Sequence, residues 1–231
     1  MASGPRILLC TAHAAARHGD ALPAAPGVIV VRARVTGPPD ARRWARAVSE
    51  LALFNWLLVP TREAAAALLA EAGAPPGGSV RLAAAGGAGA PFADAGRVPE
   101  LGGDTLEALL AALAARLGRR ERVLVPHAAT AGITIGGRLA ALGAEPVCVP
   151  AYGYAPAAGT AAAVRAARRL AALVARPDDA EVLRAALDRP PGEVRALALG
   201  AAAAAAAADC GFEAVDAAAG PLGPFLGEAL S

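Results

Sequence analysis

His127 is one side chain whose type and position in this sequence could do chemistry. It follows the apolar run Val123–Val125, which is typical of a buried strand, so its imidazole would stand at a strand end. An imidazole there could donate a proton or contact an anion. A solvated loop histidine is the competing interpretation, because no acidic residue nearby in the sequence would tune its pKa. His13, in the first loop of the chain, could also reach such a site.

Two other functions, dinucleotide binding and phosphorylation as a receiver domain, are not supported by the sequence. The glycine-rich stretch Gly86–Gly89 invites a dinucleotide-binding interpretation, but the Gly-x-Gly-x-x-Gly pattern is broken at Phe92. A phosphorylated receiver domain would need a lysine beside its acidic site, and the chain has no lysine. Asp178 and Asp179 stand where a helix cap is expected.

The composition indicates a folded protein without a nucleic-acid or membrane surface. Hydrophobic residues make up 56% of the chain and charged residues 18%, which favours a packed core over disorder. A net charge of +2 with scattered arginines excludes a basic binding surface, and the cluster Arg116–Arg122 is typical of a solvated helix end. No stretch suits a secretory signal or a membrane span, so we expect a cytoplasmic protein.

The cysteines indicate reduced core thiols. Cys10, Cys148 and Cys210 are odd in number, far apart and near predicted strand ends. Such spacing supports neither a disulfide framework nor a zinc site, so we expect no metal.

Strands and helices are expected to alternate along the whole chain, which predicts parallel sheets with helices on both faces. The strands are expected at Arg6–Cys10, Val28–Val35, Phe54–Val59, Val80–Ala84, near Arg97–Pro99, Val123–Val125, Pro146–Val149, near Leu170–Val174, Val194–Leu199 and Glu213–Val215. The helices are expected at Thr11–Ala25, Ala41–Leu53, Ala64–Ala72, before Gly96, Leu106–Leu117, before Gly143, Ala161–Arg169, Ala180–Leu187, 201–208 and Leu222–Leu230.

The chain also contains an internal repeat. The segments Trp56–Leu117 and Leu170–Leu230 have the same order of strands, glycine loops and helices. In each, a strand led by Val-Arg, at Val80 and at Val194, ends in a glycine and is followed by a helix. A repeat of this length predicts two related α/β units produced by duplication.

This order of elements resembles the uroporphyrinogen-III synthase family over essentially the whole chain. The segments that carry the resemblance are FNWLLVPTREAAAALL (54–69), VRLAAAGGAGA (80–90), RVLVPHAA (122–129), LAALGAEPVCVPAY (139–152) and VRALALGAAAAAA (194–206). The resemblance implies two flavodoxin-like parallel-sheet domains joined by a two-stranded linker. The first domain would be discontinuous, with Met1–Ala33 plus Ala151–Ser231, and Arg34–Pro150 would be inserted as the second. Val28–Val35 and Pro146–Tyr154 would be the linker strands.

The resemblance also implies a reaction. A lyase of this family cyclises hydroxymethylbilane to uroporphyrinogen III with inversion of ring D, without a cofactor. Tyr152 matches the tyrosine of the family and would be the catalytic acid, although a place in the strand ladder is an equal alternative for it. The partner would be this small-molecule substrate, a linear tetrapyrrole, with no nucleic acid or membrane, and the protein would be a monomer.

Ligands of open parallel sheets bind beyond the carboxyl ends of the strands, so the loops there would line an interdomain cleft. The substrate-binding residues expected on this basis are Thr11, His13, Thr61, Arg62, Gly86, Gly87, His127, Arg176, Gly200 and Ala201. Several hydroxyls that are common in the family are replaced here, notably in the loops Ala175–Asp178 and Gly200–Ala203. Either Arg62, Arg176 and His127 replace the lost contacts, or the fold binds or cyclises a different small molecule in a specialised pathway.

Overall fold

The computed structural model describes residues 6–11, 27–31, 33–129, 133–156, 160–166, 169–187 and 190–216. Most of the expected helix Thr11–Ala25, the whole expected helix Leu222–Leu230 and the candidate His13 lie outside the described residues.

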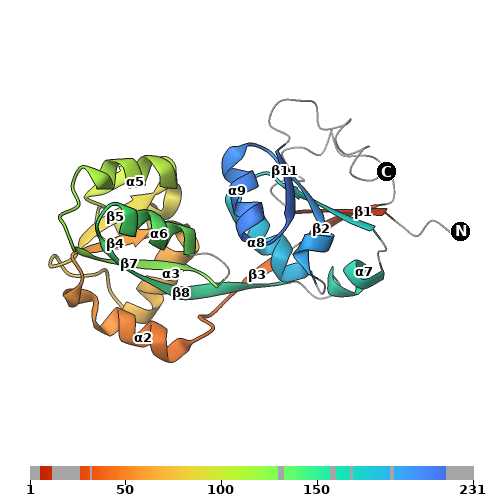
Figure 1. Cartoon of the computed structure of the whole chain (residues 1–231). Helices are drawn as coiled ribbons and strands as arrows, with labels where there is room; N and C mark the ends of the chain where they lie inside the picture. Colours follow the sequence, from red (N-terminus) through yellow and green to blue (C-terminus); the bar gives the residue numbers. More distant parts are fainter. Residues whose placement is uncertain are drawn as a thin grey trace, which may run out of the picture. The chain divides into compact units, whose positions relative to one another are not determined.

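Strands and helices alternate through the described residues, as predicted (Figure 1). The strands are β1 (Arg6–Thr11), β2 (Val28–Val31), β3 (Ala33–Thr36), β4 (Trp56–Val59), β5 (Arg81–Ala85), β6 (Leu101–Gly103), β7 (Arg122–Ala128), β8 (Glu145–Pro156), β9 (Arg169–Val174), β10 (Arg195–Ala198) and β11 (Glu213–Asp216). The helices are α2 (Ala41–Ser49), α3 (Arg62–Ala72), α4 (Ala90–Asp94), α5 (Leu106–Ala114), α6 (Ile133–Ala141), α7 (Thr160–Ala166), α8 (Pro177–Ala186) and α9 (Ala201–Asp209), with short 3₁₀ turns η2 (Leu51–Leu53), η3 (Gly86–Gly89) and η4 (Pro191–Glu193).

The chain divides into two compact units. The first unit is drawn from the ranges 1–34 and 154–231, and the second unit is Val35–Gly153. Each unit contains its own sheet, and each is described by itself below.

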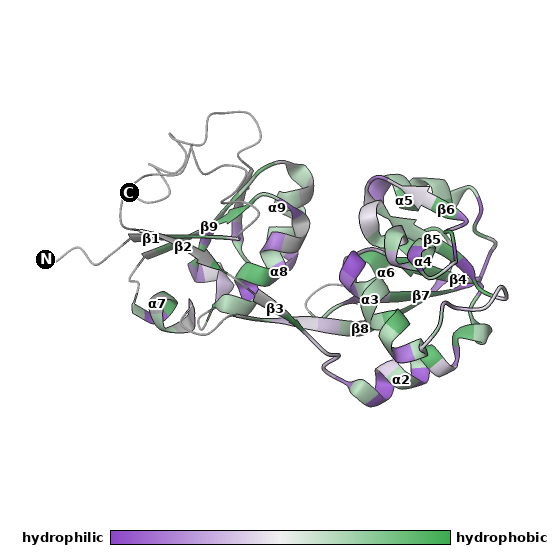
Figure 2. Cartoon of the chain, turned by 180° about the vertical axis from the view of Figure 1, so that it is seen from behind, coloured by the Kyte–Doolittle hydropathy of each residue, from purple (hydrophilic) through white to green (hydrophobic). Residues whose placement is uncertain are grey.

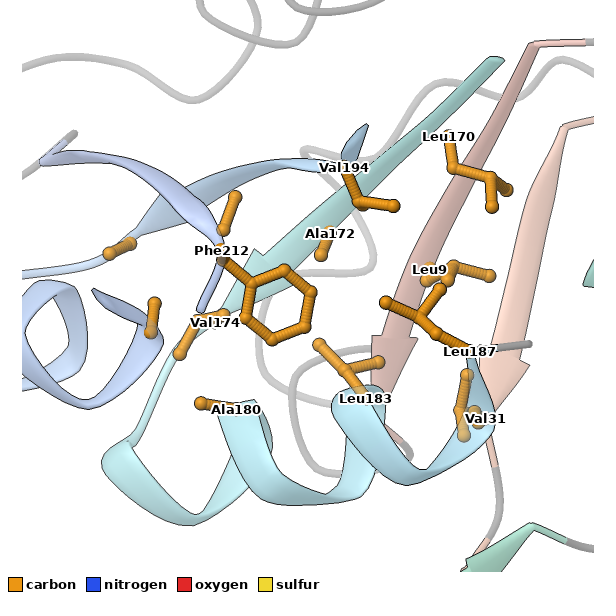
Figure 3. Packing of buried hydrophobic residues seen from close by; sticks show 14 of the residues in the cluster. Leu9, Val31, Leu170, Ala172, Val174, Ala180, Leu183, Leu187, Val194 and Phe212 are labelled. Carbon is orange, nitrogen blue, oxygen red and sulfur yellow. The ribbon is translucent and has the colours of Figure 1, made fainter. Parts of the chain in front are cut away.

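The sheet of the first unit has the strand order β11-β10-β9-β1-β2, and its strand pairs are parallel. Numbered along the chain, this is the flavodoxin-type order. One face packs against α8 and α9, where Leu183 and Phe212 lie together among the strand side chains (Figure 3). Residues on the opposite face, such as Leu8 and Leu173, are fully buried as well, as a parallel sheet requires.

The sheet of the second unit has the order β3-β8-β7-β4-β5-β6. Its pairs β4–β5, β4–β7, β5–β6 and β7–β8 are parallel. One face, with Trp56 and Val125, packs against α5 and α6, and helices α5 and α2 lie on opposite sides of β4 and β7 in both views (Figures 1 and 2). In Figure 2, β7 is coloured hydrophobic whereas α2 carries hydrophilic residues. Helices therefore cover both faces of this sheet.

The predicted repeat is confirmed over its described part, and the two sheets are built alike. Strands β9, β10 and β11 are neighbours in one sheet, as β4, β5 and β6 are in the other. β9 is followed in its sheet by β1 and β2, and β4 is followed in its sheet by β7 and β8. The two sheets therefore have the same spatial order of strands, but the strands occur in a different order along the chain. Trp56 pairs with Arg81 as Ala171 pairs with Arg195. Counting forward from this register, Thr61 corresponds to Arg176 and Ala64 to Asp179.

Two predicted strands differ in detail. The segment expected as the strand Val28–Val35 contributes to two sheets: β2 pairs with β1 in the first sheet, and β3 lies beside β8 in the second. Apolar patterning cannot reveal this change of sheet, because both parts are strand-like. The short strand expected near Arg97–Pro99 is instead β6, Leu101–Gly103. Proline has no amide hydrogen, and pairing begins only where the Glu100 N–H donates to the Leu82 carbonyl at 2.9 Å.

The amino ends of three strands in the second unit meet at Glu121. Its carboxylate accepts hydrogen bonds from Trp56 Nε1 at 3.0 Å, from the Gly118 N–H at 2.9 Å and from the Arg81 guanidinium. The Arg81 guanidinium also lies 4.3 Å from the centre of the Trp56 ring. Burial alone would raise the pKa of Glu121, but these hydrogen bonds and the Arg81 charge outweigh it and lower the pKa below its usual value.

Replacing Glu121 by glutamine should lower the free energy of unfolding by roughly 1 to 2 kcal/mol at neutral pH, because charge-assisted hydrogen bonds are lost. A carboxyl whose pKa is lowered on folding stabilises the fold above its ordinary value of 4.5 and loses that contribution as the pH falls further. Urea unfolding at a series of pH values should therefore show the gap between wild type and Glu121→Gln shrinking below pH 4.5. A gap that does not change with pH would contradict this role of the carboxylate.

Candidate functional site

The described site candidates lie at or just beyond the carboxyl ends of strands, where open parallel sheets bind ligands. In the second unit these are Thr61, Arg62, Gly86, Gly87 and His127, whereas Tyr152 lies inside β8, where it pairs with Ala128, the last residue of β7. In the first unit these are Thr11, Arg176, Gly200 and Ala201. The candidates are thus divided between two sheet edges.

A hydroxyl pair forms at the edge of the second unit. Thr61 precedes α3, and its Oγ1 accepts a hydrogen bond from the Ala64 N–H at 3.2 Å, which caps the helix. The Tyr152 hydroxyl, from β8, lies 2.8 Å from the same Thr61 oxygen. Tyr152 is 2% exposed and Thr61 is half-buried, so the bond between them is partly buried. The pair therefore fixes a phenol where the first turn of α3 meets the sheet.

His127 lies inside β7 and is buried, so the solvated-loop interpretation was wrong. The β7–β8 register pairs His127 with Pro150 and Ala128 with Tyr152, which places His127 and Tyr152 on opposite faces of the sheet. His127 Nδ1 lies 2.6 Å from the Ala128 carbonyl oxygen, an acceptor, so Nδ1 carries the proton. Burial lowers the pKa of His127; the Ala128 hydrogen bond partly opposes this, and the nearby Arg43 charge adds to it.

Backbone shape explains two of the candidate glycines. Gly86 has φ 47° and its counterpart Gly200 has φ 105°, both in the region that favours glycine. A side chain at Gly86 would also come within 3.3 Å of the Asp104 carbonyl oxygen. Gly87 has no such constraint, and it is exposed, as are Arg62 and Ala201 at the first positions of α3 and α9.

The edge of the first unit is centred on Asp179, which was expected as a helix cap. Because α8 begins at Pro177, the cap residue is Arg176 and Asp179 lies in the first turn. Its carboxylate accepts hydrogen bonds from Thr11 Oγ1 at 2.7 Å, from the Arg176 N–H at 2.9 Å and from the Ala175 N–H at 3.1 Å. The Arg176 side chain is 48% exposed and lies 3.9 Å from the same carboxylate. Burial, and secondly the charge of Asp179, raise the pKa of Cys10 to about 11, so this thiol stays protonated at neutral pH.

The cysteines, possible metal-binding groups and possible membrane-spanning helices are three further features of the described residues. Cys10, Cys148 and Cys210 keep their thiol groups and are not joined in disulfides. The described ranges hold no group of three His, Cys, Asp or Glu side chains able to bind a metal ion. No helix in the part of the chain that the structure describes is long and apolar enough to span a membrane.

Sequence reasoning named Thr61 and Tyr152 separately and missed that they bond to each other. It also gave no role to Arg43, which follows the helix cap Asp40 and donates to the Cys148 carbonyl oxygen at 3.2 Å. The repeat held a usable signal for Asp179, since it aligns an aspartate with Ala64. No sequence signal pointed to Arg43.

Parallel sheets with polar groups at the carboxyl edges define a doubly wound α/β protein of the kind that binds small molecules. This chain belongs to the uroporphyrinogen-III synthase family, since the family model described as "Uroporphyrinogen-III synthase HemD" matches residues 25–221. No curated protein sequence matches the chain.

Solved structures show the same fold. Uroporphyrinogen III synthase from Thermus thermophilus is 20% identical, with a TM-score of 0.50 over 98% of this chain and 100% of that one. A mutant uroporphyrinogen III synthase from the same extremely thermophilic bacterium is 20% identical, with a TM-score of 0.55 over 97% and 96% of the two chains. At this identity the likeness concerns the fold alone.

Replacing Arg43 by glutamine should raise the pKa of His127, because a positive charge beside the imidazole is removed. Proton NMR can follow the ring signals, since the chain has three histidines. Arg42→Gln, at the exposed neighbouring position, is the matched control and should leave the titration unchanged. In the wild type, the lowered pKa of His127 should also reduce stability as the pH falls below 6.5. An unchanged His127 titration in Arg43→Gln would contradict the assignment.

Proposed function

We propose that this protein is a cofactor-independent lyase that cyclises hydroxymethylbilane to uroporphyrinogen III with inversion of ring D. Family membership supports the reaction class. The observation that carries the proposal for this chain is the hydrogen bond between Tyr152 and Thr61, which holds a phenol at the carboxyl edge of the second sheet. The two flavodoxin-like domains, joined by two strands with the first domain discontinuous, are part of the same proposal.

The reaction begins with loss of the substrate hydroxyl, and Tyr152 is the proposed acid. Its O–H gives a proton to the leaving hydroxyl, which departs as water and leaves a cationic azafulvene. The azafulvene carbon that lost the hydroxyl is then attacked by the substituted carbon of ring D, which forms a spiro intermediate. This intermediate fragments, and the macrocycle closes with ring D inverted. The protein needs to supply an acid and a rigid surface that holds the chain ends.

Thr61 is the proposed positioning residue for Tyr152. Its oxygen lies between the Ala64 N–H and the Tyr152 hydroxyl, so its own place is fixed by α3. The hydrogen bond holds the Tyr152 hydroxyl in one orientation relative to the start of α3. A fixed orientation lowers the entropic cost of reaching the reactive geometry with the substrate. The exposed Arg62 and the backbone at Gly87 are the proposed contacts for substrate carboxylates on this unit.

Incubation with hydroxymethylbilane, followed by separation of the uroporphyrinogen isomers, tests the activity. The wild type should form isomer III faster than the substrate closes spontaneously to isomer I. Formation of isomer I alone, at the spontaneous rate, would refute the proposed function.

Tyr152→Phe should lower kcat about 100-fold, because a positioned acid contributes at least this much. Thr61→Val should lower kcat by less than Tyr152→Phe does, and Thr61→Ser should keep kcat near the wild-type value. The double variant Thr61→Val with Tyr152→Phe should be no slower than Tyr152→Phe alone. Thr105→Val is the matched control, since Thr105 caps α5 through the Ala108 N–H at 3.1 Å and should affect stability only. Additive effects of the two site variants would contradict the positioning role.

A further inference from the structure

Asp179 is a buried carboxylate whose partners come from separate parts of the first unit. It is 1% exposed. The Thr11 hydroxyl reaches it from the end of β1, and two backbone N–H groups reach it from the turn between β9 and α8. A carboxylate removed from water is costly unless hydrogen bonds replace its hydration, and here three donors do so.

The place of this carboxylate in the sheet is informative. In a sheet of this strand order, β1 and β9 flank the point where the order reverses, and ligands of doubly wound proteins bind beyond the strand ends there. Backbone N–H groups together with a hydroxyl are the donors that a ligand carboxylate would use at such a point. Asp179 holds all three of these hydrogen bonds.

The second unit differs at the equivalent position. The counterpart of Asp179 is Ala64, whose side chain has no hydrogen-bond acceptor. The Ala64 N–H donates to the Thr61 hydroxyl. In both units a side chain from the sheet bonds to the first turn of the equivalent helix, Tyr152 to Thr61 in one and Thr11 to Asp179 in the other. One edge therefore carries hydroxyls and the other carries an anion of its own.

We propose that Asp179 is an internal anion that takes the place of a ligand carboxylate on these three donors at the β1/β9 edge, so that they accept no carboxylate of the substrate. The statement about the substrate rests on the proposed function, because hydroxymethylbilane carries several carboxylates. A second carboxylate would find these donors occupied by Asp179, and the nearby Arg176 guanidinium, 3.9 Å from Asp179, is already paired with that charge. Thr11 and the backbone of Arg176, expected to bind the substrate, are then structural partners of Asp179.

Asp179→Ala with added formate tests the internal anion, because formate replaces the carboxylate that the substitution deletes. In sodium chloride the variant should melt about 5 °C or more below the wild type, since buried donors lose their acceptor. Sodium formate at equal ionic strength should recover at least about half of this loss in melting temperature, with saturation. The wild type should melt equally in the two salts. The readout is folding, so it is independent of whether the protein acts on hydroxymethylbilane.

Two controls separate filling of the site from a general salt effect. Asp179→Asn keeps the volume of the side chain, so it should be destabilised but should not respond to formate. Asp40→Ala removes an exposed cap, whose carboxylate accepts from the Arg43 N–H at 3.0 Å, and water can replace that carboxylate without formate. An equal response to formate in Asp179→Ala and Asp40→Ala would overturn the proposal. If Asp179→Ala does not fold in chloride, refolding in formate supports the proposal, and failure in both salts overturns it.

Discussion

Burial of both faces of the parallel sheets is the constraint on which the rest of this structure depends. Strand residues such as Leu57 and Leu58 point to opposite faces, and both are fully buried. A sheet of this kind has no face left for polar chemistry, so reactive groups are confined to the strand ends and the turns beyond them. Buried His127 and Asp179 obey this rule, since both stand at carboxyl ends and both use backbone partners to satisfy their polar atoms.

The two sheet edges show how one arrangement can be put to different uses. The repeated units share strand order and register, and their helices α3 and α8 begin at equivalent positions. The N–H groups of a first helical turn need acceptors in either unit. In the second unit a threonine hydroxyl at the cap serves, and a tyrosine joins it. In the first unit the cap residue is Arg176, whose side chain cannot accept. Asp179, within the helix, instead accepts from the N–H groups of Ala175 and Arg176, which precede the first turn.

The amino edge of the second unit has the opposite character. Glu121 joins Trp56, Gly118 and Arg81 through hydrogen bonds, and Arg122 lies over the Phe54 ring at 4.7 Å. The contacts of Glu121 join the starts of β4, β5 and β7 to one another. These polar contacts thus lie at the amino ends of the strands, whereas the hydroxyl pair lies on the opposite side, at the end of β7.

The sequence by itself determined the alternation of elements, the parallel sheets and the repeat, because apolar runs, caps and glycine stops are local signals. Val80 and Val194 introduce matching strands for this reason, and the start of a helix near Asp178 and Asp179 was recognisable in the same way. The tertiary structure alone decided which strands became neighbours, and therefore that Val28–Val35 is shared between two sheets and that Tyr152 meets Thr61. Contacts between residues so far apart in the chain depend on strand order and register, which no local pattern encodes.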